Sequence, residues 1–447
     1  MPAEPTAIYL DNHATTRTDP QVVEAMLPFF SERFGNAASI SHAYGDDAAA
    51  AVESAREEVA LLAGARPQEV IFTSGATEAN NLALKGLLGS FDTPRHLVVS
   101  NTEHPSVLDP VARLERNGHR VTRVACDATG QVDASDVLSA IESDTAVVSV
   151  MWANNEVGTI NPVAEIAEGC AGREVVFHTD AVQAIGRVEV DCSNVPVGLL
   201  SMSAHKIYGP MGVGALIVRR GDRRIRLAPQ IEGGGHESHL RSGTLPVPLV
   251  VGFGAACRLA GESIESESGR LRGLAQRLVE GIRKRLEGVH LNGHPKDRLP
   301  GNVHLGFEGV DGDALVAGLK RIAVSSGSAC TTADPEPSHV LAAMGIPDAL
   351  SRASLRFGLG RFNTGDDVAV AIEAYRFNDA ANAAYHFVWH TFCDWYLEFA
   401  KPVLYGDEGV AKDETRATAA WVLDRILAIM HPITPFVTEE LSRSLGW

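Results

Sequence analysis

The sequence VGLLSMSAHK, residues 197–206, begins as an apolar strand and ends in a polar turn that carries Lys206. Stretches of the same form occur at EVIFTSG (69–75), HLVVSNTEH (96–104), TAVVSVMWANNE (145–156) and EVVFHTDAVQ (174–183), and GVGALIVRR (212–220) follows as a further strand. Near-continuous apolar runs separated by helical stretches are typical of a buried, largely parallel sheet. The chain from about Ala48 to Ala260 is therefore predicted to have an α/β fold.

Polar side chains follow these predicted strands where each strand ends. They are Ser74-Gly75, Glu103-His104, Asn154-Asn155, Asp180 and His205-Lys206. In open α/β sheets, ligands bind in the crevice beyond the carboxyl ends of the strands. The sequence therefore predicts one site that gathers residues from several strand ends.

Length and charge limit what the rest of the chain can be. Its 447 residues exceed the roughly 250–300 at which single cores stop growing, so we expect at least two domains. The net charge of −17 argues against strong non-specific binding to nucleic acid or to an anionic membrane, because both need a basic face. We find no signal peptide and no apolar run of about 18 residues, and so predict no membrane span.

The cysteines indicate a reduced chain. They are Cys126, Cys170, Cys192, Cys257, Cys330 and Cys393, scattered and without a CxxC pair. This spacing predicts neither a disulfide framework nor a zinc site. We expect a cytoplasmic protein whose cysteines are mostly small core hydrophobes.

The predicted organisation has three parts. Residues 16–260 form a large domain, and residues 1–15 together with 261–374 form a smaller α+β domain. Residues 375–447 hold four of the five tryptophans and show no strand pattern. In this tail RATAAWVLDRILAIM has the apolar spacing of a helix, and YGDEG at 405–409 is typical of a loop between two helices. We interpret the tail as an appended helical unit.

Lys206 lies at a strand end beside small residues and a glycine-proline turn. A lysine held there and partly desolvated could form a Schiff base with a carbonyl. The alternative is a solvated surface lysine, and the neighbouring motifs favour the reactive one. Ser74-Gly75-Ala76-Thr77-Glu78 opens a helix and could bind a phosphate.

Two other strand-end residues have a functional and a structural interpretation. Asp180 could pair with a protonated pyridine nitrogen, which would make a bound cofactor an electron sink, or it could cap a helix. His104 could stack on an aromatic ring or move protons, or it could be structural.

Cys330 lies in SSGSACTTADPEPSHV, which is rich in small and turn-forming residues and is predicted to be an exposed, mobile loop. A cysteine there is a candidate nucleophile if its thiolate is accessible. The alternative is an incidental surface thiol.

From about Ile8 to Ile372 the chain resembles the cysteine desulfurases of the NifS/IscS type, which share the class V aminotransferase fold. The matching segments are YLDNHATT, FGNAASISHAYG, IFTSGATEANNLALKG, TEHPSVL, MWANNEVGTI, HTDAVQAIG, SMSAHKIYGPMGVGAL, GGGHE, RSGTLP, SSGSACT and LRFGLGRFN, in this order. The resemblance implies a fold-type I transferase that depends on pyridoxal 5′-phosphate (PLP): a large, mostly parallel sheet domain plus a small α+β domain.

The resemblance also implies roles for residues around the cofactor. Lys206 would anchor it as a Schiff base, Asp180 would face the pyridine nitrogen and Gln183 the ring hydroxyl. His104 would stack on the ring and move protons, and Asn155 would orient cofactor and substrate. The phosphate would be held by Ala76, Thr77, Ser203 and His205.

For the substrate, L-cysteine, the resemblance implies a carboxylate held by Arg356 through a bidentate ion pair. Cys330 would attack the substrate's sulfur, leaving alanine and an enzyme persulfide. Thr244 would reach the phosphate of a partner subunit's cofactor, which implies a homodimer. The sulfur acceptor would be an iron–sulfur scaffold or a tRNA-thiolation partner. No resident metal is implied, although Cys330 could transiently ligate an iron–sulfur cluster through its persulfide.

The tail departs from this family, and residues 375–447 resemble the anticodon-binding helical region of valyl-tRNA synthetase. No HIGH-like or KMSKS-like element occurs in the chain, so we expect no valine activation. Residues 376–447 hold six Lys+Arg and ten Asp+Glu, a net charge of 6 − 10 = −4, and we expect little tRNA affinity. A natural fusion and an artificial joining of two reading frames both fit the sequence.

Three functions are compatible with these patterns. The first is cysteine desulfurase, and the second is a tRNA- or partner-binding module with an inactive α/β part. The third is another PLP enzyme of this fold, such as a selenocysteine lyase or an aminotransferase. The α/β part keeps every residue that desulfuration needs, and transamination needs no thiol such as Cys330, so the sequence favours the desulfurase.

Overall fold

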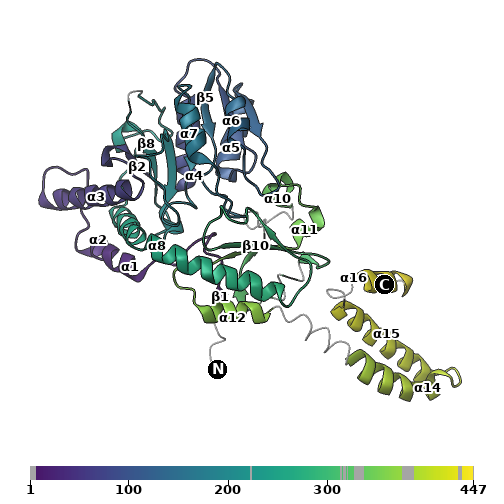
Figure 1. Cartoon of the computed structure of the whole chain (residues 1–447). Helices are drawn as coiled ribbons and strands as arrows, with labels where there is room; N and C mark the ends of the chain where they lie inside the picture. The colour runs from purple at the N-terminus through teal and green to yellow at the C-terminus, as the bar shows by residue number, and fades with distance from the viewer. Residues whose placement is uncertain are drawn as a thin grey trace.

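A computed structural model describes residues 7–221, 224–312, 315, 319, 321–326, 337–374, 387–430 and 435–445. Figure 1 shows an α/β part, purple to green, and a helical C-terminal part in yellow-green. Cys330, the predicted nucleophile, lies outside the described residues, as do residues 375–386 and 446–447 of the predicted helical tail.

A sheet with the strand order β2-β8-β7-β6-β5-β3-β4 forms the centre of the larger part. From β4 across to β7 all neighbours are parallel, whereas β8 is antiparallel to both β7 and β2. The mostly parallel sheet predicted from the sequence is confirmed. Its strands are β2 (Val70–Thr73), β3 (His96–Ser100), β4 (Arg120–Val124), β5 (Thr145–Ser149), β6 (Val176–Asp180), β7 (Leu199–Ser203) and β8 (Gly214–Val218).

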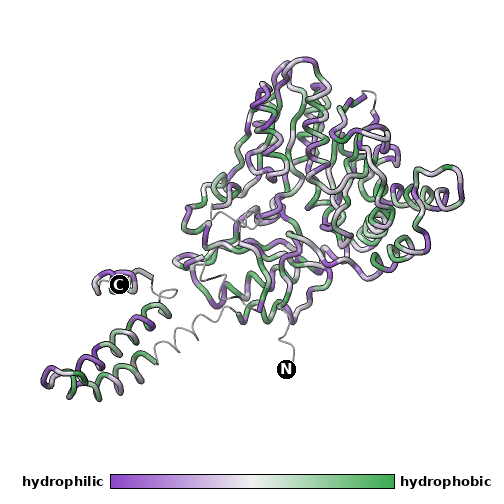
Figure 2. The backbone as a smooth tube through the Cα atoms, turned by 180° about the vertical axis from the view of Figure 1, so that it is seen from behind, coloured by the Kyte–Doolittle hydropathy of each residue, from purple (hydrophilic) through white to green (hydrophobic). Residues whose placement is uncertain are grey.

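Helices cover both faces of this sheet. Because successive residues of a strand point to opposite faces, each strand contributes side chains to the cores on both sides. In β3, Leu97 and Val99 belong to the apolar core that also contains α4 and α5, whereas Val98 belongs to the core that also contains α3, α6, α7 and the first half of α8 (Val247–Arg283). Figure 2 shows apolar segments, in green, in the interior of the large part. The helices are α1 (Pro20–Met26), α2 (Pro28–Ser31), α3 (Ala43–Leu62), α4 (Ala76–Leu88), α5 (Pro105–Arg116), α6 (Ala134–Ser139) and α7 (Val163–Ala171).

Short 3₁₀ turns lie between these elements. They are η1 (Pro67–Glu69), η2 (Ala204–Lys206) and η3 (Glu237–His239). The turn η2 directly follows β7, so Lys206 stands just beyond the carboxyl end of a central strand.

The smaller part is built on an antiparallel sheet with the order β12-β13-β10-β9. The N-terminal arm joins this part, because β1 (Ile8–Tyr9) pairs in parallel with β11 (Ile322–Ala323). Leu10 and Phe357 are buried in its apolar core. The other elements are β9 (Val289–Asn292), β10 (Asn302–Phe307), β12 (Ser325–Ser326), β13 (Ser354–Gly358), α10 (His339–Ala343), α11 (Asp348–Arg352) and α12 (Gly365–Ala374).

The helix α8 (Val247–Arg283) connects the two parts without a break. Its first half contributes Val250 and Phe253 to the core of the large part, and its second half contributes Leu271 and Leu278 to the core of the small part. By length and composition alone, α8 could cross a membrane, and 44% of its most apolar window is buried within the protein. Its burial in two cores is the behaviour of a helix inside a globular protein.

The C-terminal part is helical. It contains a π-helical segment η4 (Phe387–Leu397), α14 (Glu398–Leu404), α15 (Val410–Met430) and α16 (Pro435–Leu445). The predicted loop at 405–409 separates α14 from α15, which is confirmed. Ile426 and Leu427 of α15 are buried, whereas Trp395 and Trp421 are each 62% exposed. This part therefore leaves large aromatic side chains in solvent.

Candidate active site

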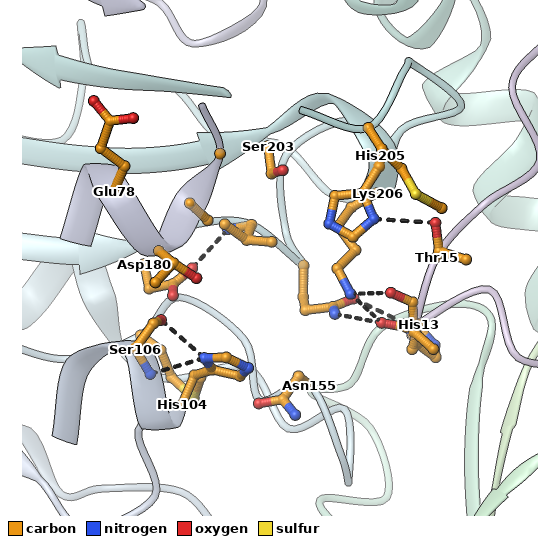
Figure 3. Close-up of a pocket in the computed structure, with 18 of the residues that line it drawn as sticks. His13, Thr15, Glu78, His104, Ser106, Asn155, Asp180, Ser203, His205 and Lys206 are labelled. Atoms are coloured by element: carbon orange, nitrogen blue, oxygen red, sulfur yellow. Dashed lines mark hydrogen bonds between the residues drawn. The ribbon is translucent and has the colours of Figure 1, made fainter. Parts of the chain in front are cut away.

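The site is a cavity of about 570 Å³ at the carboxyl edge of the large sheet. Ten of the twelve predicted site residues line it (Figure 3): Ala76, Thr77, His104, Asn155, Asp180, Gln183, Ser203, His205, Lys206 and Arg356. The turn after β2, the loops after β3, β5, β6 and β7, the N-terminal arm and β13 each contribute. Segments that are distant in sequence thus meet where parallel strands end.

One end of the cavity is formed by the first turn of α4. Gly75 precedes this helix with φ 151°, a backbone conformation that side chains rarely allow. A Cβ on Gly214 of β8 would lie 2.8 Å from the Cα of Gly75, so glycine is needed at this close approach. Free backbone N–H groups at a helix N-terminus, with Ser203 across the cavity, suit a phosphate.

Glu78 lies in the first turn of α4, but its negative charge does not disfavour a phosphate at this end of the helix. It accepts a hydrogen bond from the Ser74 backbone N–H and forms a 2.9 Å ion pair with Arg241. Burial alone would raise the pKa of Glu78, but the bonds from Arg241 and Ser74 hold it below its usual value. The carboxylate is thus neutralised by its own partners.

Asp180 ends β6 and is 6% exposed. Its carboxylate accepts hydrogen bonds from the Asn80 side-chain amide at 2.8 Å and from the Val182 backbone N–H at 3.0 Å. Within the described part of the chain, no lysine, arginine or histidine nitrogen lies within 4.0 Å of it. A buried carboxylate with only neutral donors provides a place for a cationic ligand group.

His104 is the N-cap of α5 as well as a wall of the cavity. Its Nδ1 accepts a hydrogen bond from the Ser106 backbone N–H at 3.1 Å and lies 2.8 Å from the Ser106 hydroxyl. This assigns the ring hydrogen of the neutral form to Nε2. Burial lowers the pKa of His104, so the ring is neutral near pH 7. The structural and functional interpretations of this residue are therefore compatible.

Lys206 extends from η2 toward the N-terminal arm (Figure 3). Its ammonium donates to the carbonyl oxygens of His13 at 2.7 Å and Ala14 at 2.5 Å. The neighbouring His205 lies 3.1 Å from the Thr15 hydroxyl, and burial lowers the pKa of His205 to about 4. The arm thus places its backbone carbonyls directly on the lysine.

Arg356 on β13 enters the cavity from the small part and is 6% exposed. It donates to Asp11 at 2.9 Å, to the Asn155 carbonyl at 3.0 Å and to the Ser325 hydroxyl at 3.2 Å. Its Nε is buried and has no hydrogen-bond partner among the described residues. Three of the five N–H groups of the guanidinium are thus used, and the Nε–H and one NH1 hydrogen remain for a ligand carboxylate.

In each of the pairs Glu103-His104 and Asn154-Asn155, one residue lines the cavity and the other supports the loop. His104 and Asn155 line the cavity, whereas Glu103 and Asn154 are fully buried beside it. Glu103 accepts from the Ser100 hydroxyl at 2.6 Å and the Met151 N–H at 2.7 Å, and burial raises the pKa of its carboxyl to about 8. Asn154 caps the backbone N–H groups of the two residues after Asn155. These two residues therefore shape the loops that carry the site.

The two remaining predicted residues are Thr244 and Cys330. Thr244 is exposed and does not line this cavity, and Cys330 lies outside the described residues. The other five cysteines do not line the cavity either. Burial raises the pKa of both Cys170 and Cys192 to about 12, and raises that of Cys257 well above its usual value. These three thiols are inert core groups, as the sequence predicted.

Sequence reasoning missed the arm residues Asp11, His13 and Thr15. The structure brings them against Arg356, Gln183 and His205, respectively. Their only signal was a place inside the matching segment YLDNHATT, which gave no role to any single residue.

Comparison with known proteins covers the whole α/β part. Residues 8–370 match the class-V aminotransferase family. Cysteine desulfurase IscS of Anaeromyxobacter sp. (strain K) is 50% identical over 369 residues, which are 82% of this chain and 91% of the relative. The chain belongs to the cysteine desulfurases of this family.

Other cysteine desulfurases support the same membership. The mouse (Mus musculus) enzyme is 48% identical over 367 residues, covering 82% of this chain and 80% of its own. A solved NifS-like protein superposes with a TM-score of 0.77 at 35% identity, over 82% of this chain and 98% of its own. SspA, solved in complex with cysteine, superposes with a TM-score of 0.71 at 34% identity, over 80% of this chain and 100% of its own.

The tail of this cysteine desulfurase chain matches a second family. Residues 363–447 match the anticodon-binding domain of tRNA ligase. The predicted fusion of a desulfurase with an anticodon-binding-like segment is therefore confirmed, and the match begins close to the start of α12.

Proposed function

We propose that this protein is a PLP-dependent cysteine desulfurase that moves sulfur from L-cysteine to Cys330. The observation that carries the proposal is the placement of Lys206 and Asp180 in one cavity, with the α4 N-terminus at its end. A lysine anchor, a carboxylate for a ring nitrogen and a phosphate cradle are the requirements of this cofactor. The identity to cysteine desulfurases supplies the choice of substrate.

The residues present fit PLP. The Asp180 carboxylate, which has only neutral partners, suits a protonated pyridine nitrogen. The α4 N-terminus with Ser203 and His205 would bind the phosphate, and Gln183 would face the ring hydroxyl. When bound, PLP supplies an electron sink for the reacting carbon atoms of an amino acid.

The chain's own groups would carry the remaining steps. Arg356 would bind the substrate carboxylate through its free Nε–H, and Asn155 would help orient the substrate. Lys206 Nζ would take up and return protons. His104, whose Nδ1 carries no hydrogen, would present its Nε2–H to the ligand. Cys330 sulfur would attack the substrate's sulfur, so that the carbon–sulfur bond breaks and a sulfur–sulfur bond forms. The products would be L-alanine and a Cys330 persulfide, with no external oxidant or reductant.

A product assay tests this function. Purified protein with PLP, L-cysteine and a thiol reductant should release sulfide and L-alanine in equal amounts. Pyruvate or a transaminated product in place of alanine would instead indicate another reaction of this fold. Selenocysteine tested in parallel would show which of the two substrates is preferred.

Replacing Asp180 by asparagine should separate cofactor binding from folding. Loss of the buried charge pair with the ring nitrogen should cost about 3–5 kcal/mol, or roughly 10²–10⁴-fold in PLP affinity. The melting temperature of the cofactor-free protein should not fall, because D180N removes a buried charge and leaves a side chain of equal size. Asp136→Asn, at an exposed position in α6, is the control. Unchanged PLP affinity in D180N would remove Asp180 from the cofactor site.

The proposal extends to the protein's partners. We infer a homodimer in which the exposed Thr244 reaches the phosphate of the partner subunit's cofactor. The persulfide would pass to an iron–sulfur scaffold or to a tRNA-thiolation protein in the cytoplasm. A protein acceptor of this kind agrees with a net charge of −17, which does not favour direct capture of nucleic acid.

The charges of the tail argue against autonomous tRNA binding. Every lysine and arginine described between 387 and 445 has a carboxylate within 4.0 Å: Lys401, Lys412, Arg416, Arg425 and Arg443. Cations already paired with carboxylates are poorly placed to neutralise phosphates. We infer that the tail is a helical appendage with no aminoacylation role.

A chain that ends at Tyr375 should keep the desulfurase rate of the full-length protein. Its solubility should rise, because Trp395, Phe399 and Trp421 are large exposed apolar groups. Full-length protein should bind valine tRNA no tighter than the non-specific range of about 10⁻⁶–10⁻⁴ M. Rate, melting temperature and tRNA binding at physiological salt would be measured for both chains. Tight, sequence-selective binding by the full-length chain alone would show that the fusion is functional.

A further inference from the structure

His13 is a fully enclosed histidine in the wall of the proposed active site. It is 1% exposed and lies in the N-terminal arm, shortly after β1 ends at Tyr9. Its backbone carbonyl accepts hydrogen bonds from the side chains of both Lys206 and Gln183, and Figure 3 shows His13 beside Lys206. The roles set out above use only this backbone and leave the imidazole unassigned.

The hydrogen bonds of His13 fix its tautomer. Arg187 NH1 lies 2.6 Å from His13 Nδ1 and 2.5 Å from Gln183 Oε1. A guanidinium only donates, so its two NH1 hydrogens go to these two acceptors. Gln183 Nε2 donates to the His13 carbonyl, which settles which end of that amide is the oxygen. Nδ1 also lies 3.0 Å from Gln183 Oε1, but a hydrogen on Nδ1 would meet the hydrogens of Arg187 NH1 at 2.6 Å. Nδ1 is therefore an acceptor, and the hydrogen of the neutral ring is on Nε2.

Two donor atoms of residues that line this cavity lack a partner among the described residues. His13 Nε2 and Arg356 Nε are both buried and make no hydrogen bond within the described part of the chain. Both residues line the cavity. Burial and the nearby cations Arg187 and Arg356 hold the pKa of His13 well below its usual value. The imidazole thus stays neutral and keeps its Nε2–H.

The positive charge of Arg187, on the Nδ1 side of the His13 ring, favours an anion near the ring. Arg187 is surrounded by His13, Gln183 and the backbone carbonyls of Asn12 at 2.8 Å and Lys206 at 3.0 Å. Among the described residues, no carboxylate lies within 4.0 Å of this guanidinium. A buried cation that meets only neutral acceptors stabilises negative charge nearby.

We propose that His13 is a ligand-binding residue of the active site, whose Nε2–H, fixed by Arg187, donates to an anionic oxygen beside Gln183. This inference rests on the proposed function. Two groups carry such an oxygen: the ring hydroxyl of PLP, which Gln183 would face, and the carboxylate of L-cysteine, which Arg356 would hold.

The test compares His13→Leu with His13→Gln. Leucine fills similar space without a donor, whereas glutamine can accept from Arg187 and still donate into the cavity. The absorbance spectrum and dissociation constant of bound PLP are measured without substrate. The dissociation constants of L-cysteine and of cysteamine, which lacks the carboxylate, are measured spectroscopically in protein that also carries Cys330→Ser, so that no turnover occurs.

Loss of a hydrogen bond to a charged group should weaken the binding of the affected ligand, PLP or L-cysteine, by roughly 10- to 100-fold in H13L. Most of this affinity should return in H13Q. A changed PLP spectrum and weaker PLP binding would assign the oxygen to the cofactor. Unchanged PLP with weaker binding of L-cysteine, but not of cysteamine, would assign it to the substrate. Either result supports the proposal.

His96→Gln is the control for loss of a buried imidazole. His96 begins β3, at the opposite end of that strand from the site. Each of its ring nitrogens is hydrogen-bonded to a threonine hydroxyl. Both measurements should match wild type in H96Q. If H13L does not fold, His13→Ala carries the same predictions.

Wild-type values for both PLP and L-cysteine in a folded H13L or H13A protein would overturn the role of His13. Failure of the wild-type protein to bind PLP would instead overturn the proposed function itself.

Discussion

Lys206→Ala should abolish desulfuration and leave a folded protein that loses its PLP on gel filtration. Lys206 would be both the covalent anchor and a proton carrier, and loss of a positioned acid–base group alone costs about 10²–10⁴-fold. The expected fall in sulfide release is therefore roughly 10³-fold or more. Sulfide release and PLP content after gel filtration would be measured on the same samples.

Lys85→Ala is the matched control for this change. Lys85 lies on α4 in the same part of the molecule, outside the cavity, and its ammonium donates to the Asn81 side chain at 3.3 Å. It should keep wild-type activity and PLP. A Lys206→Ala protein that retains activity would mean that another amine holds the cofactor.

Cys330→Ser should release almost no sulfide while PLP still binds. Serine is a weak nucleophile at neutral pH and cannot form a persulfide, so the rate should fall by roughly 10³-fold or more. The PLP spectrum should still change when L-cysteine is added, because binding does not need the thiol. Stopped-flow absorbance and a sulfide assay would separate the two steps.

Cys126→Ser is the control for Cys330→Ser. Cys126 is half-buried and does not line the cavity, and burial raises the pKa of its thiol. This variant should release sulfide at the wild-type rate. Normal sulfide release by Cys330→Ser would move the sulfur-transfer role to a different thiol.

The elements of the fold could be predicted from local patterns, because each central strand is an apolar run that ends in polar residues. The direction of β8 could not be predicted. Gly214–Val218 alternates between the two faces of the sheet in the same way whether the strand runs parallel or antiparallel, so only its partners β7 and β2 reveal it. Likewise, the continuous helix α8 crosses the expected domain boundary at 260/261 without a sequence signal at that point.

Part of the site was predictable for the same reason. Asp180 and Lys206 are the residues that follow β6 and β7, and the carboxyl ends of parallel strands meet at one edge. His13 and Arg187 were not predictable, since their contact joins residues 174 positions apart. A single chain gives no signal that an arm near the N-terminus packs against the turn after β6. The tautomer of His13 exists only through that contact.

The central claim is that Lys206 holds PLP in this cavity, and borohydride reduction tests it most directly. The purified protein should be yellow, and reduction should bleach it and fix the cofactor to the chain. Peptide mass spectrometry should then find the added mass of the reduced cofactor on the peptide that contains Lys206. A colourless protein that takes up no PLP, or the added mass on a different lysine, would contradict the account.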